Sequence, residues 1–193
     1  DVERSRGLGD VYKRQTYNAS QGKSAYAAII NRLDRPVSGL VLIARNKSAA
    51  AKYSTLMQKE GGFNKQYEAL ICGKLSEPKG TFVDYLKKDG RTNTSAIVPA
   101  DAAANDKDAK LSKLEYEVIS YDEVKDITHV RIHLITGRHH QIRVQFASRR
   151  HPLVGDYKYA TADCGMDNAV KAVALKRNQI ALCAVCLLYT SDA

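Results

Sequence analysis

The sequence predicts an α+β domain built on one large, mainly antiparallel β-sheet with flanking helices. Many short apolar runs have the composition of strands, whereas two segments show the 3.6-residue spacing of a helix. With 193 residues, 44% apolar and 26% charged, the chain fits one globular domain. This composition excludes intrinsic disorder and a coiled coil.

The first predicted elements are a strand and a helix. Gly39 to Ala44 (GLVLIA) is a short apolar run bounded by turn residues, which is typical of a buried strand. Asn46 or Ser48 can cap a helix that continues through Glu60 and places its apolar residues on one stripe. The glycine pair that follows predicts the end of this helix.

Four further segments have the composition of strands, and the last alternates apolar and polar side chains: Lys65 to Cys72, Thr81 to Leu86, Leu111 to Ser120 and Thr128 to Leu134. Asp101 to Lys110 (DAAANDKDAK) has no periodicity and predicts an exposed loop or hairpin tip. Gln141 to Arg150 follows the turn Thr136-Gly137-Arg138 and has apolar residues at helical spacing, so we expect a second helix there.

The two ends of the chain differ from the middle. Residues 1–15 have little apolar periodicity, and residues 186–193 (CLLYTSDA) break off after a strand-like run. We expect the first segment to be non-native or disordered and the second to be a non-native tail. The domain is expected over residues 16–185, and a truncation at both of its ends is left open.

Charge and apolar runs limit the partners and the compartment. Thirty lysines and arginines against 21 acids give a net charge of +9, which favours a polyanionic partner. The longest apolar run, Ile180 to Tyr189, has ten residues, whereas a membrane helix needs about 17 to 25. We therefore expect no membrane association, and without a secretory leader we expect a cytoplasmic protein. A monomer is the default expectation.

Cysteine usage predicts neither a disulfide framework nor a metal site. Four cysteines are too few for a disulfide scaffold and are expected to be thiols in a reducing compartment. Cys183 and Cys186 form a C-x-x-C pair, but it has no second ligand pair. His129 and His133 would lie about 13 Å apart on one strand, too far to share an ion. We expect no metal and no organic cofactor.

A single carboxylate stands out in Asn31 to Leu40 (NRLDRPVSGL). Asp34 lies between Arg32 and Arg35, and Pro36 fixes the turn that follows. A carboxylate near guanidinium groups is ionised at neutral pH, which suits a nucleophile and not a general acid. The alternative is that Asp34 only bonds its own backbone in the turn.

Positive charge is segregated from Ile127 to Gly155. These 29 residues contain no aspartate, glutamate or lysine, but they hold all five histidines and five arginines: Arg131, Arg138, Arg143, Arg149 and Arg150. The guanidinium fork suits phosphate oxygens. The segment therefore predicts a surface that faces RNA or DNA, with an ordinary solvated basic face as the alternative.

The lack of a second acidic residue near Asp34 in the sequence limits the reactions that it could catalyse. Glycosidic hydrolysis usually needs two carboxylates, and Asp34 has no acidic neighbour in the sequence. One carboxylate fits a reaction whose leaving group needs little protonation and whose product needs no water. Conversion of a uridine from an N-glycoside to a C-glycoside is such a reaction.

Three ordered blocks resemble the RluA-type pseudouridine synthase family: NRLDRPVSGLVLIA (31–44), KQYEAL (65–70) and LITGRHHQIRVQF (134–146) followed by HPLVGDYKY (151–159). The resemblance covers about Ile29 to Val185 and implies a pseudouridine synthase-like fold. It implies that Asp34 is the nucleophile, that Arg138 pairs with it, and that Tyr67 packs on the uracil ring and can accept a proton.

The resemblance also implies an RNA-binding set. Arg32 matches the arginine that holds the place of the extruded nucleotide, and the other expected RNA-contacting residues are Lys65, His140, Gln141 and Arg143. For Gln141 and Arg143 a structural role is the alternative, as is core packing for Tyr67. Asn31 departs from the histidine that is common in the family, which bears on the choice of substrate more than on activity.

The implied activity is isomerisation of uridine to pseudouridine in structured ribosomal or transfer RNA. Two other classes of function are left open: a catalytically inactive RNA-binding module, and a carboxylate-dependent hydrolase of nucleic acids or glycosides. The retained Asp34, Tyr67 and Arg138 argue against the first, and the absence of a second acid or a metal cluster in the sequence argues against the second.

Overall fold

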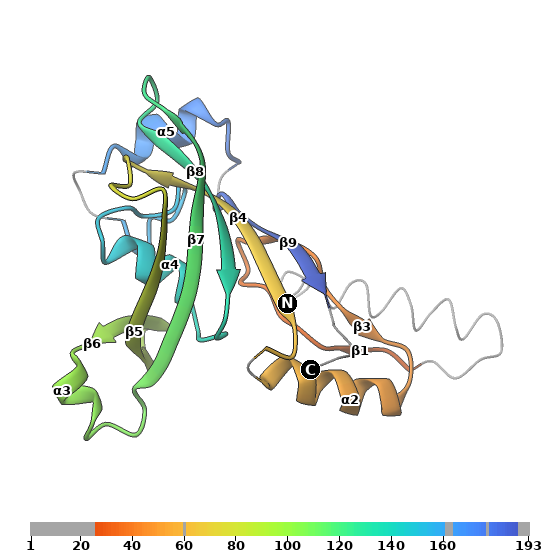
Figure 1. The fold of residues 1–193 in the computed structure, drawn as a ribbon. Coiled ribbons are helices and arrows are strands. Elements are labelled where there is room, and N and C mark those ends of the chain that lie inside the picture. Colours follow the sequence, from red (N-terminus) through yellow and green to blue (C-terminus); the bar gives the residue numbers. More distant parts are fainter. Residues whose placement is uncertain (1–25, 60, 161–163, 177, 189–193) are drawn as a thin grey trace.

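The expected α+β fold is confirmed in this computed structural model, which describes residues 26–59, 61–160, 164–176 and 178–188. A seven-stranded sheet has the order β2-β9-β4-β8-β7-β5-β6 (Figure 1). All neighbouring strands are antiparallel except β2 and β9. Its strands are β2 (Ser38–Gly39), β4 (Asn64–Cys72), β5 (Lys79–Asp89), β6 (Thr94–Val98), β7 (Lys110–Asp122), β8 (Ile127–Leu134) and β9 (Leu182–Leu188).

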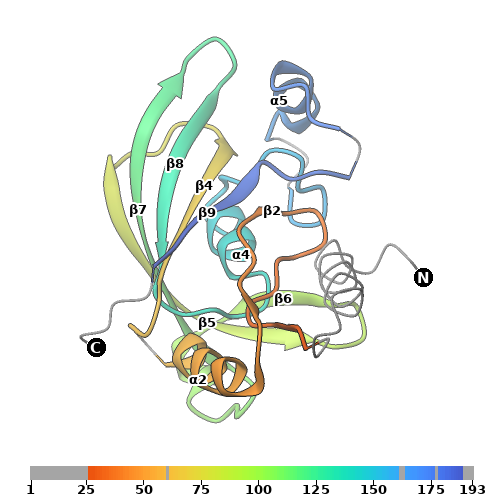
Figure 2. The ribbon, with the colours of Figure 1, turned by 90° about the vertical axis from the view of Figure 1, so that its right-hand side faces the viewer.

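A two-stranded ribbon and four short helices complete the described fold. The ribbon pairs β1 (Ala28–Ile29) with β3 (Ile43–Ala44). In Figure 2, α4 lies against one face of the large sheet, and α2 lies beyond the sheet's lower end. No helix in the described ranges is long and apolar enough to cross a membrane. The helices are α2 (Lys47–Gln58), α3 (Ala100–Ala103), α4 (Gln141–Ala147) and α5 (Met166–Ala172).

The core lies between the sheet and α4. Phe146 of α4 is fully buried, and its ring meets the rings of Phe82 and Tyr116 at centroid distances of 5.0 and 5.9 Å. The side chains of β8 alternate as predicted. Val130, Ile132 and Leu134 are buried, and the side chains between them lie on the other face of the sheet. One face of the sheet therefore fixes α4, and the helix carries part of the site described below.

The expected strand from Gly39 to Ala44 is wrong as a single element. Ser38 and Gly39 pair with β9, the chain then leaves the sheet, and Ile43 and Ala44 pair with β1. The side chain of Asn31 spans this break, donating to the carbonyl of Leu40 (3.1 Å) and accepting from the N–H of Leu42 (2.7 Å). These bonds satisfy backbone groups that a continuous strand would have paired.

The predicted helices are confirmed, with different ends. Asn46 caps α2 by accepting from the N–H of Ala49 at 2.8 Å, and the helix ends at Gln58 rather than Glu60, which lies outside the described residues. α4 ends at Ala147 and not at Arg150. β6, α3 and α5 were not predicted. Asp101 to Lys110 is largely exposed as expected, although its first residues belong to α3.

The described residues include only part of the two terminal segments that were expected to lie outside the domain. Residues 1–15 lie outside the described residues. At the other end, β9 extends to Leu188, so residues 186–188 of the expected tail pair with β4. The sheet therefore runs three residues past the expected boundary at Val185.

Gly39 holds β2 against β9 and so fixes the turn that carries Asp34. Its φ is +125°, and a Cβ at this position would lie 2.4 Å from the backbone nitrogen and oxygen of Ala184. We expect Gly39→Ala to lower the free energy of unfolding by about 1–3 kcal/mol or more. Gly90→Ala is the matched control, because a Cβ there meets no atom within 4 Å. Urea denaturation followed by circular dichroism measures both; equal stabilities would contradict the role given to Gly39.

Candidate active site

Asp34 lies in the turn between β1 and β2. The turn is closed by its backbone carbonyl, which accepts from the N–H of Val37 at 2.9 Å. The carbonyl of Pro36 accepts from the N–H of Ile180, next to β9. The side chain of Asp34 is 32% exposed, and in the described part of the chain it makes no bond to its own backbone. The turn therefore leaves the carboxylate of Asp34 available to bind groups from other segments.

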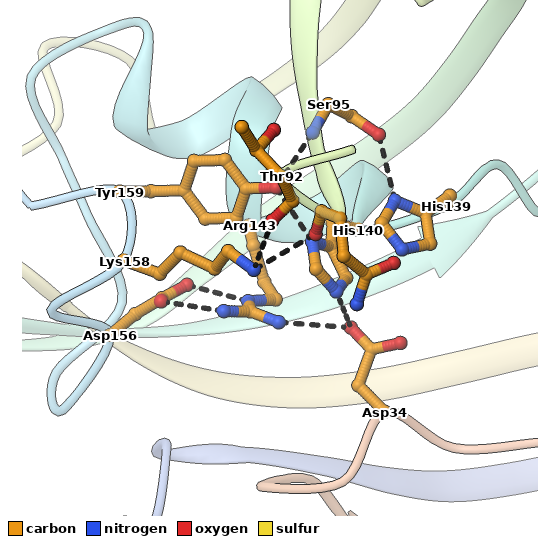
Figure 3. Close-up of polar contacts among 10 residues, drawn as sticks. Asp34, Thr92, Ser95, His139, His140, Arg143, Asp156, Lys158 and Tyr159 are labelled. Atoms are coloured by element: carbon orange, nitrogen blue, oxygen red, sulfur yellow. Dashed lines mark hydrogen bonds and ion pairs between the residues drawn. The ribbon is translucent and has the colours of Figure 1, made fainter. Parts of the chain in front are cut away.

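Arg143 of α4 is the guanidinium that pairs with Asp34. Its Nη1 lies 3.3 Å from Oδ2 of Asp34, while Nε and Nη2 donate to the two carboxylate oxygens of Asp156 at 2.7 and 2.8 Å (Figure 3). The side chains of Arg143 and Asp156 are 5% and 1% exposed. Burial alone would lower the pKa of Arg143, but the hydrogen bonds and charge of Asp156, with the charge of Asp34, raise it. The guanidinium stays charged.

The expected pairing of Arg138 with Asp34 is therefore replaced by Arg143. Nε of Arg138 donates to the carbonyl of Leu111 at 2.9 Å, and its backbone N–H donates to Oε1 of Gln141. Because α4 begins at Gln141, Arg143 lies in the buried first turn of the helix. Arg138 precedes the helix and is exposed. The same motif supplied both arginines, and the start of the helix decides which one turns inward.

Tyr67 lies on β4, half-buried and packed against the core beside the site. Burial raises the pKa of its hydroxyl, and the charge of Asp34 raises it further. Tyr67 and Leu33, the residue before Asp34, pack against the same core cluster. A phenol that stays protonated at neutral pH fits a ring for stacking better than a ready proton acceptor.

His140 contacts Asp34 and not the outer surface. It occupies the N-cap position of α4 with a left-handed φ of 54°, and its ring stacks on His139 with centroids 3.7 Å apart. Nε2 lies 3.7 Å from Oδ2 of Asp34, and the side chain is 8% exposed. Burial, followed by the charge of Arg143, lowers the pKa of His140 to about 3. The residue is a neutral imidazole beside the carboxylate.

Two more residues expected to contact RNA are buried. The side chain of Gln141 accepts from the hydroxyl of Thr136 at 2.8 Å and donates to Gln145 and to the carbonyl of Lys113, so it builds the turn before α4. Lys65 is 8% exposed, and a Cβ added to Gly137 would lie 3.9 Å from its Nζ. Of the expected RNA-binding set, only Arg32 is exposed.

The segment from Ile127 to Gly155 does not form one basic surface. On β8, His129 and Arg131 contact Glu68, and His133 contacts Glu115, all on the sheet face away from α4. Acids from neighbouring strands therefore pair with basic residues that look unopposed in the sequence. No group of three or more histidines, cysteines, aspartates or glutamates within the described ranges is arranged to hold a metal ion.

Arg149 is also held inside an ion pair. Its guanidinium contacts both carboxylate oxygens of Asp84 at 3.0 and 3.1 Å and lies 4.0 Å from the centroid of the Phe82 ring. The guanidinium of Arg149 is thus already paired with a carboxylate and covers an aromatic ring. Arg149 therefore belongs to the packing of α4 against β5.

The sequence reasoning missed Asp156 and Tyr159. Asp156 binds Arg143, and the hydroxyl of Tyr159 lies 2.6 Å from Nδ1 of His140. A signal for Asp156 was present, because it is the first acid after the acid-free segment that ends at Gly155. A buried arginine in that segment needs a carboxylate, and Asp156 is the first one after it.

The candidate site joins the partly exposed carboxylate of Asp34 to the buried guanidinium of Arg143, with the Tyr67 ring packed on the adjoining core. The sequence model of the family described as RNA pseudouridylate synthase matches residues 6–148. The chain belongs to this family. The RluA-type resemblance read from the three motifs is therefore confirmed.

The chain is also similar to individual curated proteins that are named as pseudouridine synthases. It is 36% identical over 138 residues to the ribosomal large subunit pseudouridine synthase D of Blochmanniella floridana. This alignment covers 70% of this chain and 39% of the relative. It is 34% identical over 138 residues to the uncharacterized RNA pseudouridine synthase YjbO of Bacillus subtilis, covering 72% and 45%. The chain thus spans less than half the length of these relatives.

Solved structures agree with the family fold. Human RNA pseudouridylate synthase domain containing 1 superposes with a TM-score of 0.71 at 26% identity, covering 86% of this chain and 65% of the human one. Human RNA pseudouridylate synthase domain containing 4 has a TM-score of 0.74 at 18% identity, covering 95% and 75%. At 18% identity, the similarity to the second human protein supports a shared fold only.

Removing Arg143 should cost far more stability than removing Arg138. Arg143→Met leaves Asp156 buried without its counter-charge, so we expect the free energy of unfolding to fall by about 3–5 kcal/mol. Arg138→Met, the same change at an exposed residue, should cost about 1 kcal/mol or less. Urea titrations of both variants measure the difference. Equal losses would contradict the assignment of Arg143 as the buried partner.

Acid sensitivity should depend on His140. Its pKa falls from the ordinary 6.5 to about 3 in the folded chain, so the unfolded chain takes up a proton first as the pH drops. This residue therefore removes stability as the pH falls from 6.5 towards 3. His140→Gln cannot take up that proton, and its Tm should fall less over this range than that of the wild type. Parallel Tm curves in thermal scans at several pH values would disprove this.

Proposed function

We propose that the protein isomerises uridine to pseudouridine in structured RNA, ribosomal or transfer, in the cytoplasm. The observation that carries the proposal is the carboxylate of Asp34, held by buried Arg143 and still 32% exposed, in a chain of the pseudouridylate synthase family. Tyr67 packs against the core cluster that Leu33, the residue before Asp34, also contacts, and its planar ring can stack on an unstacked uracil. Asp34, Tyr67 and Arg143 form the proposed catalytic set.

The proposed reaction needs one carboxylate and no added reactant. A carboxylate oxygen of Asp34 bonds to C1′ of the ribose as the C1′–N1 bond breaks and uracil leaves with the electron pair. After uracil turns, C5 bonds to C1′, and the bond from C1′ to Asp34 breaks. C5 loses its proton and N1 gains one, so the product is an isomer of the substrate.

Two exposed arginines are proposed as contacts to the RNA backbone. Arg32 lies two residues before the nucleophile, and Arg138 lies at the turn before α4 with only a backbone carbonyl as the partner of its guanidinium in the described residues. A guanidinium without a carboxylate partner can bind a phosphate. These residues replace the buried Gln141 and Lys65 in the proposed RNA-binding surface.

Release of tritium from uracil C5 tests the activity. We propose transcripts of bacterial large-subunit ribosomal RNA as the first substrate, because several relatives are named for the ribosomal large subunit, and transfer RNA transcripts as the second. The RNA is labelled with tritium at uracil C5. We expect the protein to release label and to leave the RNA chain intact, and we expect Asp34→Asn to release none.

Asp101→Asn is the matched control, since Asp101 is an exposed aspartate of α3, outside the site. It should release label at the wild-type rate. Binding of RNA without release by either protein would indicate an inactive binding module and overturn the proposal. Shortened RNA or free uracil would indicate a hydrolase.

A further inference from the structure

A line of polar contacts runs from strand β6 to the nucleophile. The backbone N–H of Ser95 donates to the hydroxyl of Tyr159 at 2.9 Å, and that hydroxyl lies 2.6 Å from Nδ1 of His140. Nε2 of His140 lies 3.7 Å from Oδ2 of Asp34 (Figure 3). Four segments distant in the sequence therefore meet in one line that ends at the carboxylate.

The directions of these bonds identify the protonated nitrogen of His140. The N–H of Ser95 can only donate, so the oxygen of Tyr159 is an acceptor there. Among the described residues, Nδ1 of His140 is the one acceptor within reach of the Tyr159 hydroxyl proton. A Tyr159 hydroxyl that donates to Nδ1 fits both contacts, and it leaves the proton of the neutral ring on Nε2. The other tautomer would turn a lone pair of Nε2 towards the carboxylate of Asp34.

The charged groups around His140 favour this neutral form. His139 stacks on its ring, Arg143 and Lys158 bring positive charge, and Asp156 and Asp34 oppose it. Burial and the positive neighbours lower the pKa of His140 to about 3, so the ring stays neutral at the pH of the cell. The N–H that faces Asp34 is therefore an uncharged donor.

Both donors at the site face the same oxygen of Asp34. Nη1 of Arg143 and Nε2 of His140 lie 3.3 and 3.7 Å from Oδ2. No described residue donates to Oδ1. A carboxylate whose one oxygen is fixed by donors keeps the other free to attack. The longer of the two contacts is expected to shorten when substrate covers the site, as catalytic hydrogen bonds commonly do.

We propose that His140, held by Tyr159 with its proton on Nε2, is a positioning residue that orients Asp34 so that Oδ1 is the attacking oxygen. This inference rests on the proposed function for its kinetic consequence and on the geometry for the state of the ring. A neutral donor orients the carboxylate without placing a second full positive charge beside the nucleophile.

Tyr159→Phe removes the donor to Nδ1 and keeps the ring, which lies 5.1 Å from the Arg143 guanidinium. We expect kcat for tritium release to fall about 10- to 100-fold with little change in KM, because Asp34 is less well oriented. Burial and the charge of Arg143 remain in this variant, so we expect His140 to stay neutral and the pH profile to match that of the wild type. Tyr157→Phe is the control: its exposed hydroxyl bonds Asp167, and its kinetics should match the wild type.

Two substitutions of His140 separate positioning from packing. The side-chain amide of Gln reaches the place of Nε2 and can donate to Asp34, whereas that of Asn is too short. We therefore expect His140→Gln to keep at least about tenfold more kcat than His140→Asn. Equal loss in both variants, or a Tyr159→Phe variant with the kcat of the wild type, would overturn the proposal.

Nitrogen-15 NMR of the histidine rings tests the tautomer without any activity. In the wild-type protein Nδ1 of His140 should have the shift of an unprotonated nitrogen and Nε2 that of a protonated one. A protonated Nδ1 would overturn the inference even if every variant were inactive. If the wild type releases no tritium but shows this tautomer, the proposed function fails and the assigned state of His140 stands.

Discussion

The buried guanidinium of Arg143 is the constraint on which the site depends. A positive charge with 5% of its side chain exposed is costly unless carboxylates surround it. Asp156 satisfies two of its donors from the segment after α4, and Asp34 receives a third from the turn after β1. The requirement to pair one buried charge thereby brings together parts of the chain more than a hundred residues apart.

The sheet makes that pairing possible. Phe146, one turn beyond Arg143 on α4, packs on Phe82 and Tyr116, so the helix is fixed to the sheet next to its arginine. On the opposite side of the site, Gly39 lets β2 approach β9 closely enough for parallel pairing. Neither Phe146 nor Gly39 takes part in the proposed reaction. Each sets the position of one member of the ion pair.

The sequence alone points to Asp34 and Tyr67 as candidate site residues but not to the guanidinium that pairs with Asp34. Asp34 and Tyr67 lie in motifs whose residue types carry the resemblance to the family, and β8 shows its two faces through simple alternation. Arg138 and Arg143 stand five residues apart in one motif, and nothing in the residue types says which is buried. The left-handed backbone at His140 and the start of α4 at Gln141 decide it, and both are consequences of tertiary packing.

The same limit explains the other differences. The acid-free segment around β8 looked like one basic surface because strand pairing, which brings Glu68 and Glu115 beside it, is a long-range property. β6 escaped prediction because it has only five residues and pairs with a single neighbour, β5. Yet β6 supplies the backbone N–H at Ser95 that bonds Tyr159. The residues of β6 alone therefore did not predict a strand that contributes to the site.

The distribution of burial suits the role of nucleophile that we propose for Asp34. The attacking group has to meet substrate, whereas its counter-charge acts best where water does not screen it. Here Asp156 and Arg143 are almost fully buried, and Asp34 keeps a third of its side chain exposed. Asp156 absorbs most of the hydrogen-bonding capacity of the guanidinium, so Arg143 orients Asp34 through one longer contact. A tighter, bidentate pair with Asp34 would hold both carboxylate oxygens and leave neither free to attack.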